Sequence, residues 1–316
     1  LERLGVQLSA MHLPRIDTLH VTAQNGYTIK SPLALGGFGI SRFTLDYELV
    51  KTARAAGVTI HENCKVNDVQ LKNNIYEITT TAGNFRARLV CGSYGKINPA
   101  FVPRKGRKSK GKYIAVKYHI KLPFPANRIE LHNFKDGYCG ISKVDNETYC
   151  LCYLTTTENL RKNNNDIGQL EKNILMQNPW LKKYFSEAAF VFEKPLTISQ
   201  ISFNKKDTWQ NDMLLLGDAA GAIAPLCGNG MSIAMRAAAL ASPLISAYLK
   251  NTISRSELIT AYTSVWNKNF SFRIKTGYYL QHLFGKKIMT LLSLKLLNSM
   301  PRLLRKIISL THGKPF

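Results

Sequence analysis

The segment from residue 214 to residue 235 constrains the fold of this chain more than any other. It reads LLLGDAAGAIAPLCGNGMSIAM. A short apolar strand runs into Gly217-Asp218, and a long alanine-rich helix begins at Gly228-Asn229-Gly230. The pattern predicts one carboxylate at the end of a strand and, about ten residues later, an open helix N-terminus.

Both features suit a flat polar ligand. The carboxylate of Asp218 can accept hydrogen bonds from the hydroxyl groups of a sugar or polyol. The free N–H groups from Gly228 to Met231 can face electron-rich oxygen or nitrogen atoms, and the helix dipole favours negative charge there. Glycine has no Cβ, so such a ligand can lie against the backbone.

The same segment resembles the second flavin-binding motif of FAD-dependent oxidoreductases of the aromatic-hydroxylase and geranylgeranyl-reductase type. That motif has the order Gly-Asp-Ala-Ala, Pro, Gly-x-Gly. The resemblance implies that Asp218 holds the ribityl chain of FAD and that the amides from Gly228 onward face the pyrimidine end of the isoalloxazine. The alternative is an ordinary strand–turn–helix in which Asp218 caps a turn. The residues that the resemblance assigns to the cofactor are Gly217, Asp218, Pro225, Gly228, Asn229, Gly230 and Met231.

The first motif of that family is not found near the start of the chain. It consists of a strand, a Gly-x-Gly-x-x-Gly turn and an acidic residue. The glycine-dense segment 35–39 lacks the strand-to-helix context and predicts a loop. The chain also begins at Leu1. We therefore expect a fragment that lacks about fifty residues of a βαβ unit, where the pyrophosphate and adenosine would bind.

Two further segments resemble the family less fully. Arg42 precedes an expected helix that Thr44 would cap, and by resemblance Arg42 would lie near the phosphate or ribityl region of the cofactor. The alternative is a surface pair between Arg42 and Asp46, four residues on. Tyr94 stands where the family has the Asp of its Asp-Gly fingerprint. NAD(P)H remains a candidate electron donor, although this departure argues against direct NADPH use in the hydroxylase manner.

Composition limits the partners. The formal net charge of +23 fits an anionic membrane surface, nucleic acid or an anionic substrate as partner. The alternative is that the charge serves solubility or reflects an A/T-rich genome that favours Lys. No nucleic-acid module is visible, so we expect no nucleic acid as partner. The six cysteines show no metal spacing, which predicts reduced thiols, no metal and a cytoplasmic protein. We also expect no apolar run of about 20 residues, the length of a membrane-spanning helix.

The C-terminal helices are basic and amphipathic. No Asp or Glu occurs between Leu258 and Phe316, where Lys and Arg are spread among Leu, Ile, Phe and Met. This composition fits a peripheral contact with the inner face of a membrane. The alternative is a helical cap whose apolar face covers the core.

The pattern of elements predicts the α/β class. We expect a FAD-binding, Rossmann-like, three-layer domain that is incomplete at its N-terminus, an inserted antiparallel-sheet substrate domain and a helical C-terminus. The segment 103–112 predicts a basic linker. The expected ranges are 1–10, 32–102 and 201–250 for the FAD-binding domain, 11–31 and 103–200 for the substrate domain, and 251–316 for the basic helices.

The predicted function is that of a flavin-dependent oxidoreductase acting on an apolar or lipid-like small molecule, either as a monooxygenase or as a C=C reductase. Gly221 and the basic tail favour the geranylgeranyl-reductase branch, and the absence of Trp-x-Trp-x-Ile argues against a halogenase. No triad or carboxylate pair stands out, so the catalytic residues are unknown, and a flavin would carry the redox chemistry. The alternative is a non-catalytic, lipid- or membrane-associating remnant of this fold that cannot hold FAD.

Overall fold

A computed structural model describes residues 1–102, 113–201 and 206–312. The chain forms two compact units. Unit 1 comprises Leu1–Ile60, Gly111–Ile201 and His282–Ile308, and unit 2 comprises His61–Lys110, Ser202–Gln281 and Ser309–Phe316. The predicted basic linker 103–112 lies outside the described residues. The predicted domain boundaries stay predictions.

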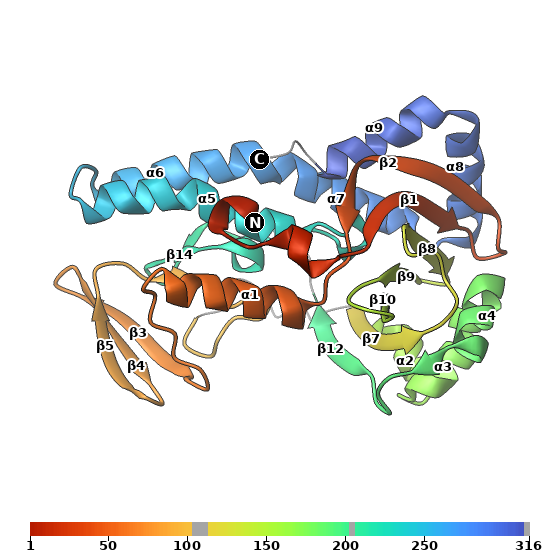
Figure 1. Ribbon diagram of the computed structural model, residues 1–316, viewed down its shortest axis with the longest axis horizontal. Coiled ribbons are helices and arrows are strands. Elements are labelled where there is room, and N and C mark those ends of the chain that lie inside the picture. The colour runs from red at the N-terminus through yellow and green to blue at the C-terminus, as the bar shows by residue number, and fades with distance from the viewer. Residues whose placement is uncertain (103–112, 202–205, 313–316) are drawn as a thin grey trace. The chain divides into compact units, whose positions relative to one another are not determined.

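Unit 1 is built on an eight-stranded sheet in the order β11-β7-β10-β9-β8-β1-β2, with β12 also paired to β7 (Figure 1). The pairs are antiparallel except for β1 and β8, which run parallel. The predicted antiparallel sheet is therefore confirmed, apart from the parallel pairing of β1 with β8. The strands are β1 Arg15–Thr22, β2 Thr28–Phe38, β7 Tyr113–Lys121, β8 Arg128–Phe134, β9 Gly137–Lys143, β10 Tyr149–Thr156, β11 Ala189–Phe190 and β12 Leu196–Ile201.

Three helices, α2 (Thr157–Lys162), α3 (Ile167–Asn173) and α4 (Pro179–Glu187), gather beside β7 and β10 of this sheet (Figure 1). Leu170 and Leu181 on these helices are fully buried in a core that they share with sheet residues such as Val116. Pro179 occupies the first helical turn, where a missing N–H costs no intrahelical bond. Helix α4 therefore begins at this proline.

Helix α1 (Arg42–Ala55) begins at Ser41 and not at Thr44, so the predicted cap was wrong. Ser41 Oγ accepts from the backbone N–H of Thr44 at 3.1 Å. The Thr44 hydroxyl instead donates to Asp145 Oδ2 at 2.6 Å, on the loop between β9 and β10. Ser41 and Thr44 are both residue types that cap helices. Because the Thr44 hydroxyl donates to Asp145, the cap is supplied by Ser41.

The glycine-dense segment 35–39 is not a loop, which corrects the sequence prediction. Its residues up to Phe38 form the end of β2, pairing Gly37 with Ile16 on β1. A register shift between Ile16 and Thr18 accompanies the positive φ of 61° at Gly36. Backbone pairing needs no side chains, so glycines can extend a strand where a neighbour supplies the partners.

Unit 2 contains two three-stranded sheets and long helices. Residues of β14 lie in one core with Ala237, Tyr262 and Phe270. The long helix predicted to begin at Gly228-Asn229-Gly230 is confirmed by α5, which starts at Gly230. The elements are β3 Val66–Lys72, β4 Ile75–Thr80, β5 Gly83–Ala87, β6 Cys91–Gly92, β13 Trp209–Gln210, β14 Met213–Leu215, α5 Gly230–Leu249, α6 Arg255–Trp266, a π-helical turn Asn267–Ser271 and α7 Phe272–Leu283, whose last residues belong to unit 1.

Helix α5 is, among the described residues, long and apolar enough to cross a membrane by length and composition, with a mean hydropathy of 1.3. The expectation that no such run exists was therefore wrong. Ala237 and Ala241 on α5 are fully buried, and the helix contacts α6. One face of α5, which carries Ile233, Ala237 and Ala241, packs in the core of unit 2, since small residues at a helix surface allow close packing. The predicted α/β class with a helical C-terminus is confirmed.

Candidate functional site

The predicted cofactor residues of unit 2 lie along one continuous segment that starts at strand β14. All three residues of β14 are buried, and Leu214 and Leu215 pair in parallel with Cys91 and Gly92 of β6. Gly217 follows with a φ of 57°, and a Cβ there would lie 3.1 Å from Cβ of Ala234 on α5. Only glycine combines this backbone conformation with so close an approach of the helix.

Asp218 stands in the turn after the strand. Its side chain is 31% exposed, and Lys96 Nζ lies 3.9 Å from its Oδ2. The ammonium of Lys206 donates to the backbone carbonyl of Lys96 at 3.0 Å. Burial lowers the pKa of Lys206, and the charge of Asp218 opposes this shift. The carboxylate therefore has positive neighbours and still keeps open acceptor positions for hydroxyl donors.

The N-terminus of α5 is open. No side-chain hydrogen bond from Asn229 caps this helix. A Cβ built at Gly228 or at Gly230 would meet no atom within 4 Å, and Gly228 has a φ of 68°. A side chain at either glycine would thus enter open space, and the helix dipole adds positive potential at this end of α5.

Asn229 gives an independent indication of a ligand. The residue is buried, and its Nδ2 donates to the carbonyl of Thr311 at 2.5 Å. Its Oδ1 is buried without a hydrogen-bond partner among the described residues. An unpaired buried carbonyl is costly, so a donor on a bound molecule would stabilise it. Together with the open glycines and Asp218, these groups fit the flavin that the resemblance implies. Of the other predicted cofactor residues, Pro225 begins the short 3-10 turn before Gly228, and Met231 is the second residue of α5.

Arg42 forms the surface ion pair that the sequence offered as the alternative to a cofactor contact. It pairs with Asp46 on the exposed side of α1, with 2.9 Å between Arg42 Nη2 and Asp46 Oδ2. Arg42 belongs to unit 1 and the other predicted cofactor residues belong to unit 2. Its contact with a cofactor stays a prediction.

Tyr94, which replaces the expected Asp, packs into the base of this segment. A Cβ at Gly92 would lie 2.8 Å both from the Tyr94 ring and from Leu215, so the tyrosine ring fills space beside β14. Its hydroxyl is buried without a partner among the described residues, and burial raises the pKa of Tyr94. A neutral phenol cannot replace a carboxylate as a charged acceptor.

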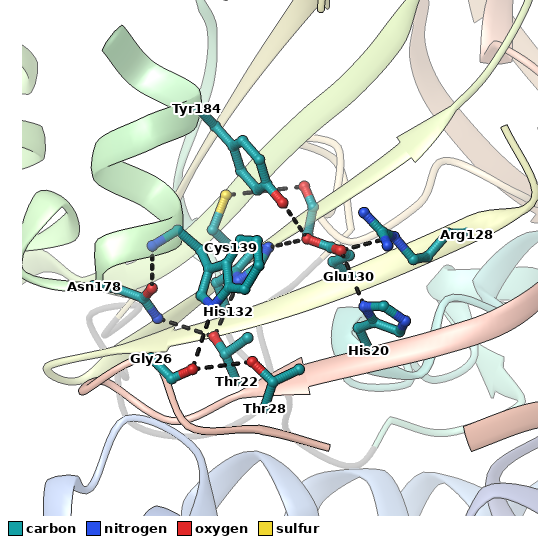
Figure 2. Close-up of polar contacts among 12 residues, drawn as sticks. His20, Thr22, Gly26, Thr28, Arg128, Glu130, His132, Cys139, Asn178 and Tyr184 are labelled. Atoms are coloured by element: carbon teal, nitrogen blue, oxygen red, sulfur yellow. Dashed lines mark hydrogen bonds and ion pairs between the residues drawn. The ribbon is translucent and has the colours of Figure 1, made fainter. Parts of the chain in front are cut away.

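Unit 1 contains a buried polar cluster that sequence reasoning missed (Figure 2). At its centre is Glu130, which is 2% exposed. Its Oε1 lies 2.8 Å from Arg128 Nε and 3.2 Å from His20 Nδ1. Its Oε2 lies 2.8 Å from His132 Nε2 and accepts from the Tyr184 hydroxyl at 2.6 Å. One buried anion is thus surrounded by four polar neighbours, which offsets its desolvation.

The polar contacts indicate the protonation state of His132 and Glu130 in this cluster. Asn178 Nδ2 donates to Thr22 Oγ1 at 3.0 Å, and Thr22 Oγ1 lies 3.0 Å from His132 Nδ1. Thr22 can therefore donate its proton to His132 Nδ1, which leaves the proton of a neutral ring on Nε2, the nitrogen that lies 2.8 Å from Glu130 Oε2. This neutral tautomer agrees with the burial that lowers the pKa of His132. Burial alone would raise the pKa of Glu130, but contacts with His132, Tyr184 and Arg128 outweigh it and lower that pKa.

The sequence did carry a signal for this cluster. Arg128, Glu130 and His132 alternate along β8, which places them on one face of the strand. The missing information was the parallel register that sets His20 of β1 opposite Glu130. No group of three His, Cys, Asp or Glu side chains in the described ranges is arranged to hold a metal ion. Through His20 and Glu130 the cluster joins β1 to β8.

No protein-family model matches the chain. It is 35% identical over 79 residues to uncharacterized protein MJ1520 of Methanocaldococcus jannaschii, which covers 25% of this chain and 20% of that protein. It is 24% identical over 252 residues to conditioned medium factor receptor 1 of Dictyostelium discoideum, covering 73% of this chain and 48% of that protein. The chain thus spans less than half the length of either relative.

Solved structures resemble the chain over nearly its whole length. The flavin-dependent brominase Bmp2 has a TM-score of 0.80 at 16% identity, over 99% of this chain and 80% of that chain. A flavoprotein/dehydrogenase from Cytophaga hutchinsonii reaches 0.79 at 15% identity, over 98% and 79%. PqsL, a probable FAD-dependent monooxygenase from Pseudomonas aeruginosa, reaches 0.70 at 14% identity, over 91% and 84%. The fold is that of FAD-binding halogenases and monooxygenases, which confirms the predicted fold class, and similarity at this level of identity extends to the fold alone.

Two glycines of the segment should respond differently to alanine. A Cβ at Gly221 would lie 2.8 Å from Cη2 of Trp266, whereas Gly230 has open space. We expect Gly221→Ala to lower the free energy of unfolding by about 1–3 kcal/mol, because the tryptophan must move. Gly230→Ala should stay within about 0.5 kcal/mol of wild type. Denaturant unfolding measures both, and equal destabilisation would contradict an open cradle at Gly230.

The buried histidines predict a pH dependence of stability. Burial lowers the pKa values of His20 and His132 from 6.5, so below about pH 6.5 the unfolded chain binds more protons than the folded one. The free energy of unfolding should therefore fall as the pH drops from about 7 to about 5. Thermal melts of His20→Gln/His132→Gln should show a shallower slope, and those of the exposed control His61→Gln an unchanged one. An unchanged slope in the double variant would contradict this assignment.

Proposed function

We propose that this chain is the flavin-holding part of a flavin-dependent oxidoreductase. The observation that carries the proposal is the uncapped N-terminus of α5, with open space at Gly228 and Gly230, directly following the turn of Asp218. Such a helix end binds groups with partial negative charge. The fold shared with flavin-dependent enzymes supports the same function.

The residues of unit 2 have separate roles in this proposal. Asp218 accepts hydrogen bonds from the ribityl hydroxyls, and the backbone N–H groups from Gly228 to Met231 face the pyrimidine end of the ring. Asn229 Oδ1, which lacks a donor among the described residues, accepts one from the bound molecule. The ammonium groups of Lys96 and Lys206 keep the surroundings of Asp218 positive. Bound FAD would supply two-electron redox chemistry with an organic substrate.

The substrate we propose is an apolar or lipid-like small molecule, and the reaction is either oxygen insertion or reduction of a carbon–carbon double bond. NAD(P)H is the proposed electron donor. The basic, apolar C-terminal sequence supports a lipid-like substrate. Substrate-dependent oxygen consumption distinguishes the two reactions, because only the monooxygenase consumes oxygen in step with product.

One observation favours a second candidate, a remnant of the fold that associates with lipids or membranes and holds no FAD. Tyr94 places a buried neutral phenol where the resemblance expects a carboxylate. Purification of the protein at its full natural length decides between the candidates. A stoichiometric flavin supports the oxidoreductase, and a colourless, folded protein that takes up no added FAD supports the remnant.

Asp218→Asn should weaken FAD binding. The substitution keeps the shape of the side chain but removes the charge, and hydrogen bonds to charged groups contribute about 1.5–3 kcal/mol. We expect the dissociation constant for FAD to rise roughly 10-fold to 150-fold, measured by quenching of flavin fluorescence. The matched control is Glu77→Gln, since Glu77 is an exposed acid of the same unit whose partner is Lys72. Equal affinities for all three proteins would remove Asp218 from the site.

A further inference from the structure

Helix α8 (Lys287–Ser299) of unit 1 buries one face and leaves an apolar face exposed. On the inner face, Thr290 and Leu294 are buried, and Thr290 Oγ1 donates to the carbonyl of Leu283 at 2.8 Å. The outer face carries large exposed side chains. These are Ile288 (71% exposed), Met289 (54%), Leu292 (59%), Leu296 (56%) and Met300 (46%), here called the α8 stripe.

The spacing of the α8 stripe makes it one continuous surface. Ile288, Leu292 and Leu296 follow each other at intervals of four residues, so their side chains lie above one another along the helix, and Met300 follows at its C-terminal end. The helical row from Ile288 to Leu296 is about 12 Å long at 1.5 Å per residue. Scattered exposed apolar residues are normal, but an aligned row of this kind indicates an interaction site.

The charges around the α8 stripe are positive. Lys287 and Lys295 on α8 are exposed, as are Arg302 and Arg305 on the part of α9 (Pro301–His312) that belongs to unit 1. Asp136 pairs with Lys286 beside them, with 3.5 Å between Oδ1 and Nζ. The chain has no Asp or Glu from Leu258 to its last residue.

We propose that the α8 stripe, with Lys287 and Lys295, docks on an anionic lipid bilayer, with α8 lying in the plane of the interface. An amphipathic helix binds there by inserting its apolar side chains at the level of the headgroups while its lysines contact anionic phosphates. A second copy of the chain is a poorer occupant, because two copies of this positively charged surface repel each other.

The proposal stands on unit 1 alone and goes beyond the flavin chemistry proposed for unit 2. Deletion of the C-terminal helices is not a suitable test of the proposal, because residues of this segment also hold each of the two units together internally. The backbone N–H of Gly285 donates to Asn133 Oδ1 at 3.1 Å, and Asn229 donates to Thr311. Removal of these residues would disturb the sheet of unit 1 and the glycine loop of unit 2, so point substitutions on the exposed face are required.

Vesicle co-sedimentation of the full chain tests the proposal. Wild type should bind phosphatidylcholine vesicles that contain phosphatidylserine, bind pure phosphatidylcholine at least tenfold less, and detach as salt is raised. Leu292→Ser/Leu296→Ser should reduce the partition coefficient for the anionic vesicles at least tenfold. Lys287→Gln/Lys295→Gln should lower it about 25-fold, since each lysine near such a surface contributes about 1 kcal/mol, or about fivefold.

The matched control is Leu196→Ser. Leu196 is 66% exposed on β12, which pairs with β7 at the far end of the sheet from β2, the strand that α8 contacts. This variant should bind vesicles as wild type does, and circular dichroism should show that all variants are folded. Equal binding to neutral and anionic vesicles, or wild-type binding by the serine double variant, would overturn the proposal. So would a dimer that the serine double variant abolishes without any vesicle binding by wild type.

Discussion

The parallel pairing of β14 with β6 is the constraint on which the candidate site depends. It fixes the point at which the chain leaves the sheet, and Gly217 then brings α5 within contact of that turn through Ala234. The start of α5 is held next to Asp218 without a cap of its own. An uncapped helix end leaves backbone N–H groups unsatisfied, and the buried alanine face of α5 offsets that cost by packing. A ligand with electron-rich atoms would satisfy the same groups.

Local signals in the sequence predicted most elements well. The start of α4 at Pro179 and the bounds of α5 follow from residues within the helices themselves. The failures have a common cause. The cap at Ser41 depends on Asp145, more than 100 residues away, and the strand character of the glycine-dense segment depends on pairing with β1. Neither partner can be read from the neighbouring sequence.

The same distinction applies to the sites. Asp218 and the glycines of the α5 loop form one short segment, so their proximity was predictable. Lys206 beside Lys96, and Thr311 beside Asn229, come from distant segments and were missed. The Glu130 cluster was missed for the same reason, because only the parallel pairing of β1 with β8 places His20 beside Glu130. Buried polar groups of this kind specify one strand register, because any shift would leave a charge unpaired.

The most direct test of the account is the FAD affinity of Gly230→Val in the full-length protein, titrated by flavin fluorescence alongside its thermal melt. The open space at Gly230 means that the folded protein accommodates the new side chain, whereas a ring lying against the α5 N-terminus would not. The account predicts at least a tenfold weaker affinity for FAD and a melting temperature close to that of wild type. Wild-type affinity in the folded variant would contradict it and place the flavin away from this helix.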